Sequence, residues 1–158
     1  MHYNFVFDTL TNSYIFATKN SILYRILFVA DSTLETAARK EIPNVFQLVI
    51  NKESNEIEPY DPKVSRTVEI IIEHFFQNIQ NSVLYICDNE EEKAETRYKI
   101  FDNWYKKSEF KKYVSKINNI IEVDNIVMYT SFLIRNENPD FNELVEIYMQ
   151  IGKSLNRK

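Results

Sequence analysis

The sequence predicts an α+β fold over residues 1–158: a single domain with one mixed, mostly antiparallel sheet and about three main helices. Three observations predict this class. Short runs rich in aromatic and β-branched residues fill the first third of the chain, separated by polar turns. Two segments with helical spacing of apolar residues follow, on either side of a short apolar run. The chain then closes with a predicted hairpin and a last helix.

Alternating hydrophobicity predicts the strands of the first third. In "SILYRILFVA" every second side chain from Ile22 to Phe28 falls on one face. The spacing then becomes helical in "DSTLETAARKEI", where Ser32 and Glu35 stand as in a capping box, which predicts a short helix. The predicted strands cover residues 3–8, 13–18, 21–30 and 44–50.

Two helices and an interior strand are predicted for the middle of the chain. Residues 61–78 form the clearest helix, because Asp61 suits the N-cap and Pro62 the first helical position. The apolar run at residues 82–88 is typical of an interior strand. Residues 89–107 predict the second helix, since three glutamates begin it and two lysines end it, matching the helix dipole.

The last part of the chain predicts a hairpin followed by a helix. Residues 115–124 and 126–135 read as strands joined by a turn at Asp124–Asn125. Pro139 then opens a helix with an apolar side. That side consists of Phe141, Leu144, Val145, Tyr148 and Ile151.

Composition excludes several classes of protein. The chain has one glycine, Gly152, so it lacks the glycine-rich loops that bring backbone close to phosphate, and we expect no cofactor. A net charge of −4 disfavours nucleic acid as a partner. One cysteine forms no internal disulfide. There is no signal-peptide pattern at "MHYNFVFD" and no apolar run long enough for a membrane span, so we expect a cytoplasmic protein that does not bind membranes.

Most of the chain resembles a known but uncharacterised family. The stretches "YDPKVSRTVEIIIEHFF", "VLYICDNEEEKAETRYKIFDNWY" and "MYTSFLIRNENPDFNELVEIY" together are similar to a family of small bacterial proteins, a domain of unknown function. The resemblance implies no activity, because none is established for that family.

The order of the predicted elements is similar to that of GNAT-type N-acetyltransferases. In that family the fourth and fifth strands run parallel and separate, and acetyl-CoA lies in the gap. Ala94 and Tyr98 have the spacing of the family's Asn-x-x-Ala-x-x-x-Tyr pattern, with Glu91 at the asparagine position. The resemblance implies a ligand cleft lined by Tyr85, Cys87 and Tyr98.

The glycine-containing turn that holds pyrophosphate in these acetyltransferases is missing. At its place the chain has "YDPKVSRTV", without glycine, and Asp61 puts a negative charge where a phosphate would lie. We therefore expect side chains to fill the gap, and we assign no catalytic residue.

Cys87 stands at the end of a predicted strand, where a nucleophile could be placed. A reactive thiolate needs nearby cations or a histidine, whereas the neighbours of Cys87 are Asp88 and Glu90–Glu92. Strand alternation also places the thiol on a covered face. The sequence therefore favours a buried, inert cysteine.

The other candidate sites have simpler interpretations as well. His74 lies at the edge of an apolar stripe, which favours a boundary histidine over a general base. His2, His74 and Cys87 are too far apart in sequence for a zinc pattern. The loop "DNEEE" lacks the alternating ligands and the glycine of a calcium loop, so we expect a helix cap and no metal.

The run "WYKKSEFKKYVSK" interleaves aromatic residues with lysines. Such a run serves protein interfaces or single-stranded nucleic acid, and the net negative charge favours a protein. An arginine at the edge of an aromatic stripe has three possible roles: stacking on a ring, binding an anion, or pairing with a carboxylate. For Arg97 we favour an ion pair, for instance with Glu69 or Asp102. The candidate partner-binding residues are Arg97, Trp104, Tyr105, Lys106, Lys107, Phe110 and Tyr113.

These observations favour a non-catalytic protein-interaction module over an enzyme. Small bacterial proteins of this kind often serve as immunity, antitoxin or regulatory partners, and a homodimer is a further alternative. The second hypothesis is a divergent GNAT-like acyltransferase, or a binder of acyl-CoA or another small ligand. The sequence does not identify the partner.

Overall fold

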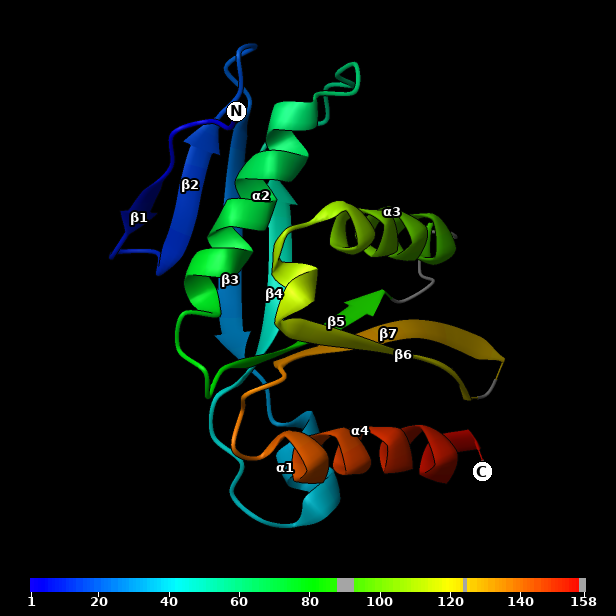
Figure 1. Cartoon of the computed structure of the whole chain (residues 1–158). Coiled ribbons are helices and arrows are strands. Elements are labelled where there is room, and N and C mark those ends of the chain that lie inside the picture. The colour runs from blue at the N-terminus through cyan, green and yellow to red at the C-terminus, as the bar shows by residue number, and fades with distance from the viewer. Residues whose placement is uncertain (88–92, 124, 157–158) are drawn as a thin grey trace.

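The computed structural model describes residues 1–87, 93–123 and 125–156, and it contains one mixed seven-stranded sheet with helices on both faces (Figure 1). The predicted α+β class is therefore confirmed. The strands are β1 (Val6–Asp8), β2 (Ser13–Ala17), β3 (Leu23–Ala30), β4 (Val45–Lys52), β5 (Ser82–Cys87), β6 (Val114–Val123) and β7 (Ile126–Arg135). The helices are α1 (Thr33–Ala38), α2 (Pro62–Phe75), α3 (Ala94–Lys107) and α4 (Phe141–Asn156), with a short 3-10 helix η1 (Phe110–Lys112).

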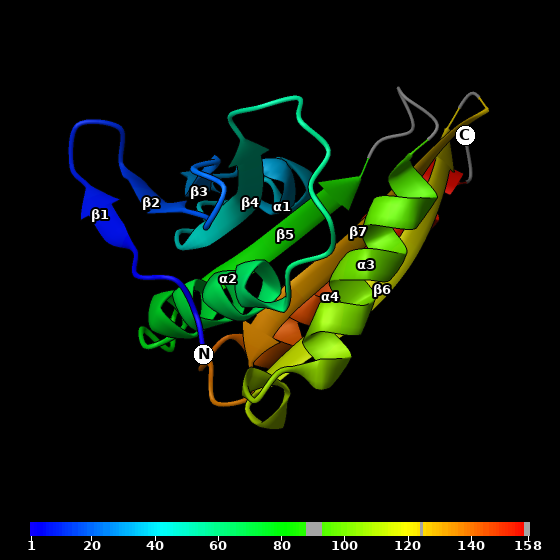
Figure 2. The same cartoon turned by 90° about the horizontal axis from the view of Figure 1, so that it is seen from above.

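The strand order is β1-β2-β3-β4-β5-β7-β6, and the β4–β5 pair is parallel while the other pairs are antiparallel. β4 and β5 pair only through Val45–Gln47 and Ser82–Leu84. Beyond these three residue pairs the two strands separate (Figures 1 and 2). The sheet thus consists of a half-sheet β1–β4 and a half-sheet β5–β7–β6, which are joined by a short seam.

Helices α2 and α3 cover one face of the sheet, and α1 and α4 cover part of the other (Figure 1). On the α2–α3 face the buried cluster includes Phe28, Ile71, Phe76 and Phe101. On the α1–α4 face it includes Leu34, Phe132, Leu144 and Tyr148. Because β5 and β7 lie inside the sheet, alternate side chains of these strands enter the two clusters, which explains why their sequences are largely apolar.

The predicted start of α2 is confirmed in detail. Asp61 is the N-cap, and its Oδ1 accepts a hydrogen bond from the backbone N–H of Lys63 at 2.9 Å. Pro62 occupies the first turn, where no N–H is needed. Val68 and Ile71 then fall on the buried side of the helix, so capping and amphipathic spacing agree.

The predicted capping box of α1 is wrong. The side chain of Ser32 makes no cap hydrogen bond. The carboxylate of Asp31, one residue earlier, accepts from Thr33 N at 2.8 Å, while Glu35 accepts from Ile42 N at 2.9 Å. A carboxylate is a stronger acceptor than a hydroxyl. Asp31 therefore accepts the backbone N–H at the start of α1, and Glu35 accepts a backbone N–H of the segment that follows the helix.

Two further boundaries differ from the prediction. α3 begins at Ala94 within the described residues, and the predicted acidic cap, Glu90–Glu92, lies outside them. The turn η1 between α3 and β6 was not predicted, and its Phe110 is buried in the core. Its lysines made this segment look exposed throughout.

Several turns use residues other than glycine in the left-handed region. Asn12, Asn44 and Asn125 have φ between 52° and 66°, a conformation that asparagine tolerates. Ser21 and Arg39 also have positive φ, at 62° and 55°. Since the only glycine, Gly152, lies in α4, these turns form without the residue that adopts positive φ most readily.

Candidate functional site

A pocket of about 640 Å³ lies between α2 and α3, beside the place where β4 and β5 separate. Figure 2 shows the segment that leads from β4 to α2 running between the two helices. α2 contributes Val64, Ser65, Arg66 and Glu69, and α3 contributes Ile100, Asn103, Trp104 and Lys107. Tyr24 of β3, Lys52 of β4 and residues 58–61 complete the lining. The volume is within the range of small-molecule sites.

The position of the pocket follows from the sheet. α2 packs on the β1–β4 half, and α3 packs on β5 and β7. The helices diverge with the strands beneath them, and this leaves a groove between Val64 on one side and Trp104 on the other. The expected filling of the gap is therefore partial: Tyr85 packs against Phe101 under α3, with ring centroids 4.2 Å apart, while the space toward α2 stays open.

The N-terminus of α2 is closed by its own side chains. Asp61 caps the helix, and its Oδ2 accepts a hydrogen bond from the Tyr3 hydroxyl, which lowers the pKa of the Asp61 carboxyl. A phosphate at this helix end would have to displace a carboxylate that already holds the first turn. The geometry agrees with the missing glycine turn and does not favour pyrophosphate at this place.

Most charged groups around the pocket already have partners. Glu69 pairs with Arg66 at 2.6 Å and accepts from Glu109 N at 2.7 Å. Glu58 accepts from the hydroxyl of Thr18 at 2.9 Å, and Lys52 donates to the carbonyl oxygen of Glu56. Lys107 is exposed near the end of α3. Arg66 and Glu69 neutralise each other, whereas Glu58 and Lys52 each have a neutral hydrogen-bond partner.

Three aromatic side chains in the pocket keep unused polar groups. The indole N–H of Trp104 and the hydroxyls of Tyr24 and Tyr60 have no hydrogen-bond partner within residues 1–87, 93–123 and 125–156. Trp104 is half-buried, and its ring packs against the core cluster. Tyr60 is 79% exposed. Trp104 was predicted to bind a partner, but nothing in the sequence indicated that Tyr24 and Tyr60 would lie in the same cavity.

The residues predicted for an acyl-CoA cleft lie under α3 and are not part of this lining. Cys87 is buried at the end of β5. Burial, together with the thiol of Cys87, raises the pKa of the Tyr85 hydroxyl. Tyr98 packs against Tyr129 at 5.3 Å between ring centroids. The three side chains share one side of the sheet with α3.

A buried lysine next to these residues was missed by sequence reasoning. The side chain of Lys116 on β6 is only 1% exposed, and its ammonium donates to Asp102 at 2.7 Å and to Asn118 at 2.6 Å. It lies within 5.1–6.0 Å of the ring centroids of Tyr98, Phe101 and Tyr105. Burial lowers the pKa of Lys116 although Asp102 opposes this.

Asp102 responds in the opposite way. Burial alone would raise the pKa of this carboxyl, but hydrogen bonds from Lys116 and Lys106 outweigh burial and lower the pKa to about 2. The pair ties α3 to the edge strand β6. A positive charge in an otherwise aromatic environment is a structural feature that only the fold could reveal.

The predicted partner-binding residues do not form one surface. Phe110 is buried, and Trp104, Tyr105 and Tyr113 are half-buried; Tyr105 donates to the carbonyl of Val114 at 2.6 Å. The other three predicted partner-binding residues, Arg97, Lys106 and Lys107, are exposed on α3. Two carboxylates that were named as possible partners of Arg97 have cationic partners of their own: Glu69 pairs with Arg66, and Asp102 pairs with Lys106 and Lys116.

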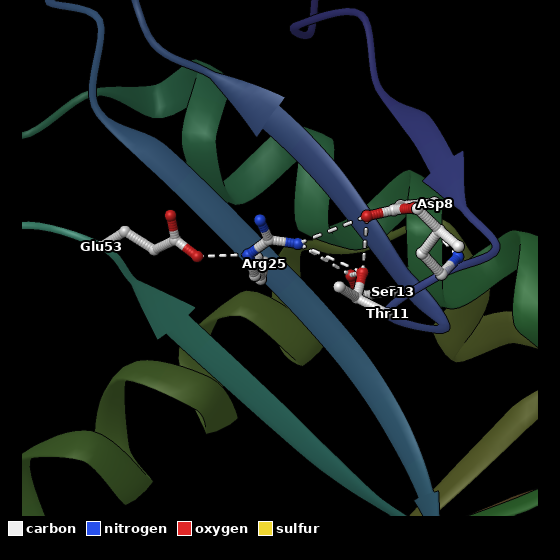
Figure 3. Close-up of polar contacts among 6 residues, drawn as sticks. Asp8, Thr11, Ser13, Arg25 and Glu53 are labelled. Carbon is white, nitrogen blue, oxygen red and sulfur yellow. Dashed lines mark hydrogen bonds and ion pairs between the residues drawn. The ribbon is translucent and has the colours of Figure 1, made fainter.

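A polar network centred on Arg25 lies on the face of the β1–β4 half-sheet that points away from α2 (Figure 3). Its guanidinium pairs with Glu53, lies 3.7 Å from Asp8, and donates to the hydroxyl of Thr11 at 3.2 Å and that of Ser13 at 3.4 Å. Two carboxylates neutralise the arginine, so the cluster ties the β1–β2 turn to β3 and β4 and leaves no charge for an external anion.

The remaining titratable candidates do not form a reactive group. His74 is exposed and lies 3.0 Å from the Tyr14 hydroxyl, at the edge of the apolar side of α2 as predicted. Among the side chains that the structure describes, no three histidine, cysteine or acidic residues stand close enough to hold a metal ion. Within the same residues no helix is both long and apolar enough to cross a membrane.

The fold and the pocket define an α+β domain in which a mixed sheet holds two helices apart around an open cavity that three aromatic residues help to line. Residues 60–150 match the family of unknown function DUF6169, which covers more than half of the chain, so the protein belongs to that family. The match includes α2 and α3, which form two walls of the pocket. No curated protein and no solved structure matches the chain.

Proposed function

We propose that this protein is a small-molecule-binding domain, and that the pocket between α2 and α3 holds the ligand without catalysis. The observation that carries the proposal is the pocket itself, which is about 640 Å³ in volume and lined by Tyr24, Val64, Ile100 and Trp104 together with a few polar groups. Cavities of this size and character are typical ligand sites in α/β proteins, where they occur at the point at which strands diverge.

The strand arrangement supports the resemblance to acetyltransferases as a scaffold. β4 and β5 are parallel and separate after three residue pairs, and the pocket lies beside the gap. The capped N-terminus of α2 argues against acyl-CoA, because Asp61 occupies the position of the pyrophosphate. Binding without acyl transfer is therefore the form of this hypothesis that the geometry favours.

Filling the pocket is expected to abolish ligand binding. Asn103→Phe places a ring in the cavity, whereas Thr96→Phe adds the same ring at an exposed position two turns earlier on α3. The emission of Trp104, the single tryptophan, is titrated with acetyl-CoA, adenosine and decanoate, and the melting temperature is followed in parallel. At least one compound should give a saturable change in the wild type and in Thr96→Phe, but not in Asn103→Phe.

Two results would overturn the proposal. One is the absence of any saturable change with all three compounds. The other is an equal response in Asn103→Phe, which would place binding elsewhere on the protein.

A protein partner is the second candidate, and one surface favours it. The face of the β1–β4 half-sheet opposite α2 carries Val6, Leu23 and Val29, which are 65%, 39% and 47% exposed. The helices on this side pack on the other half-sheet: α4 contacts β6 and β7, and α1 contacts α4. On this face the three apolar side chains lie around the neutralised Arg25 network. Exposed apolar side chains on an uncovered sheet face are typical of a protein interface, for which a second copy of this chain is the first partner to test.

A charge on this face is expected to weaken self-association. Sedimentation velocity over a wide range of protein concentration should show dimers in the wild type and fewer dimers in Val29→Glu. The control is Ile100→Glu, at a residue that is 46% exposed on the other side of the sheet. A wild type that stays monomeric at every concentration would rule out the second copy as the partner.

A further inference from the structure

The charges in the α2–α3 pocket restrict the ligands that it can hold. Asp61, Glu58 and Glu69 each accept hydrogen bonds from protein groups, and Arg66 is paired with Glu69. With Lys52 and Lys107, the lining carries three cations and three carboxylates. A charged ligand group would lose its water and would be attracted by one set and repelled by the other, which is unfavourable. The exposed Lys107 stands at the end of α3 and remains hydrated.

Besides the ammonium of Lys107, the side-chain amide of Asn103 and the polar groups of three aromatic residues line the pocket without a hydrogen-bond partner among the described residues. The indole of Trp104 can only donate a hydrogen bond, and the hydroxyls of Tyr24 and Tyr60 can donate or accept one. Burial, with Glu58 and Asp61 nearby, raises the pKa of Tyr24, so its hydroxyl stays neutral. A ligand that forms a hydrogen bond with the indole N–H of Trp104 must therefore carry a hydrogen-bond acceptor.

The rest of the lining provides apolar surface for a flat molecule. Val64 and Ile100 face the cavity from the two helices, and Pro59 closes it on the side of the segment before α2. Aromatic side chains favour stacking with planar rings. Apolar side chains together with three aromatic rings that carry polar groups suit a ring system with heteroatoms better than a flexible chain.

We infer that the ligand of this pocket is an uncharged, planar heteroaromatic molecule with hydrogen-bond acceptors, of the chemical class of a nucleobase or nucleoside without phosphate. The inference rests on the proposed function, since it takes the pocket to be the ligand site. The ring stacks on the aromatic lining and accepts a hydrogen bond from the Trp104 indole.

The single tryptophan makes this hydrogen bond directly observable. In a proton–nitrogen correlation spectrum of the isotope-labelled protein, one indole N–H signal is expected. Titration with adenosine or caffeine should move this signal saturably, and AMP, which adds only a phosphate to adenosine, should bind more weakly. Loss of the indole donor in Trp104→Phe should weaken adenosine binding, measured by calorimetry, by about 3- to 10-fold.

A matched variant separates the indole from a general loss of structure. Tyr113→Phe also removes one polar group from a half-buried aromatic residue, but outside the pocket, and should bind adenosine like the wild type. If AMP or acetyl-CoA binds in the pocket more tightly than adenosine, the uncharged class is wrong and the proposed function stands. If none of the four compounds moves the indole signal, the inference fails, and the proposed function fails with it unless decanoate still changes the Trp104 emission.

Discussion

Asp102→Ala is expected to lower the free energy of unfolding by about 3–5 kcal/mol, as for the loss of one partner from other buried ion pairs. The ammonium of Lys116 is almost wholly buried and would keep only Asn118 as an acceptor. An unpaired buried charge is far more costly than the lost attraction between two exposed groups. Urea unfolding of the variant and the wild type measures the difference.

Two variants test this explanation against a simple loss of contacts. Lys106→Ala removes the second cation that pairs with Asp102, but this lysine is 70% exposed, so a loss below about 1 kcal/mol is expected. The double variant Asp102→Leu with Lys116→Met removes both buried charges and should recover most of the lost stability. A loss below about 1 kcal/mol in Asp102→Ala would show that the pair does not hold α3 on the sheet.

The same pair determines part of the response to acid. The pKa of Asp102 is lowered to about 2 in the folded protein, below its ordinary value of 3.8. A carboxyl with a depressed folded pKa stabilises the protein above its unfolded pKa, and this stabilisation is lost as the pH falls through the folded pKa. The wild type should therefore lose more stability between about pH 4 and pH 2 than the double variant does.

Phe132→Ala is expected to cost about 3–5 kcal/mol of unfolding free energy, through lost burial and the cavity that remains. Phe132 is fully buried on the interior strand β7, and its ring stacks on Tyr148 of α4 with centroids 5.3 Å apart. It lies next to Leu84 of β5 and Ile117 of β6 in the sheet register. The substitution therefore opens the α1–α4 core at its centre.

Two substitutions on the same residue and strand calibrate this loss. Phe132→Leu keeps most of the apolar volume and should cost clearly less than the alanine variant. Ile126→Ala removes apolar surface from the same strand at a position that is 57% exposed, and a loss below about 1 kcal/mol is expected. Equal losses for Phe132→Ala and Ile126→Ala in thermal or urea unfolding would contradict the assigned core.

Much of the fold could be predicted because its signals are local. Asp61 followed by Pro62 specifies the start of α2 through capping and backbone geometry, whatever the rest of the protein does. The strands were predicted from apolar residues at every second position, and the main helices from apolar residues at helical spacing. The capping box at Ser32 failed because another acceptor, Asp31, was equally close along the chain, and η1 was hidden by the lysines around Phe110.

The site could not be predicted in the same way, because it depends on contacts between distant segments. Tyr24, Tyr60 and Trp104 come from β3, from the segment before α2 and from α3, and only the divergence of β4 and β5 brings them around one cavity. The burial of Lys116 depends likewise on how α3 lies across β6. The missing glycine turn was informative, since it excluded a phosphate site at α2, but it did not show what the cavity could hold instead.

The short seam between β4 and β5 has a mechanical consequence. Three residue pairs connect the half-sheet that carries α2 to the half-sheet that carries α3, as few as join β1 to β2 and fewer than join any other two neighbouring strands. A small rotation of one half-sheet relative to the other about Val45–Gln47 would widen or narrow the pocket between α2 and α3. The hydrogen bonds between strands within each half-sheet would be kept. The width of the pocket is thus coupled to the angle between the two half-sheets, and a ligand held between α2 and α3 would fix that angle.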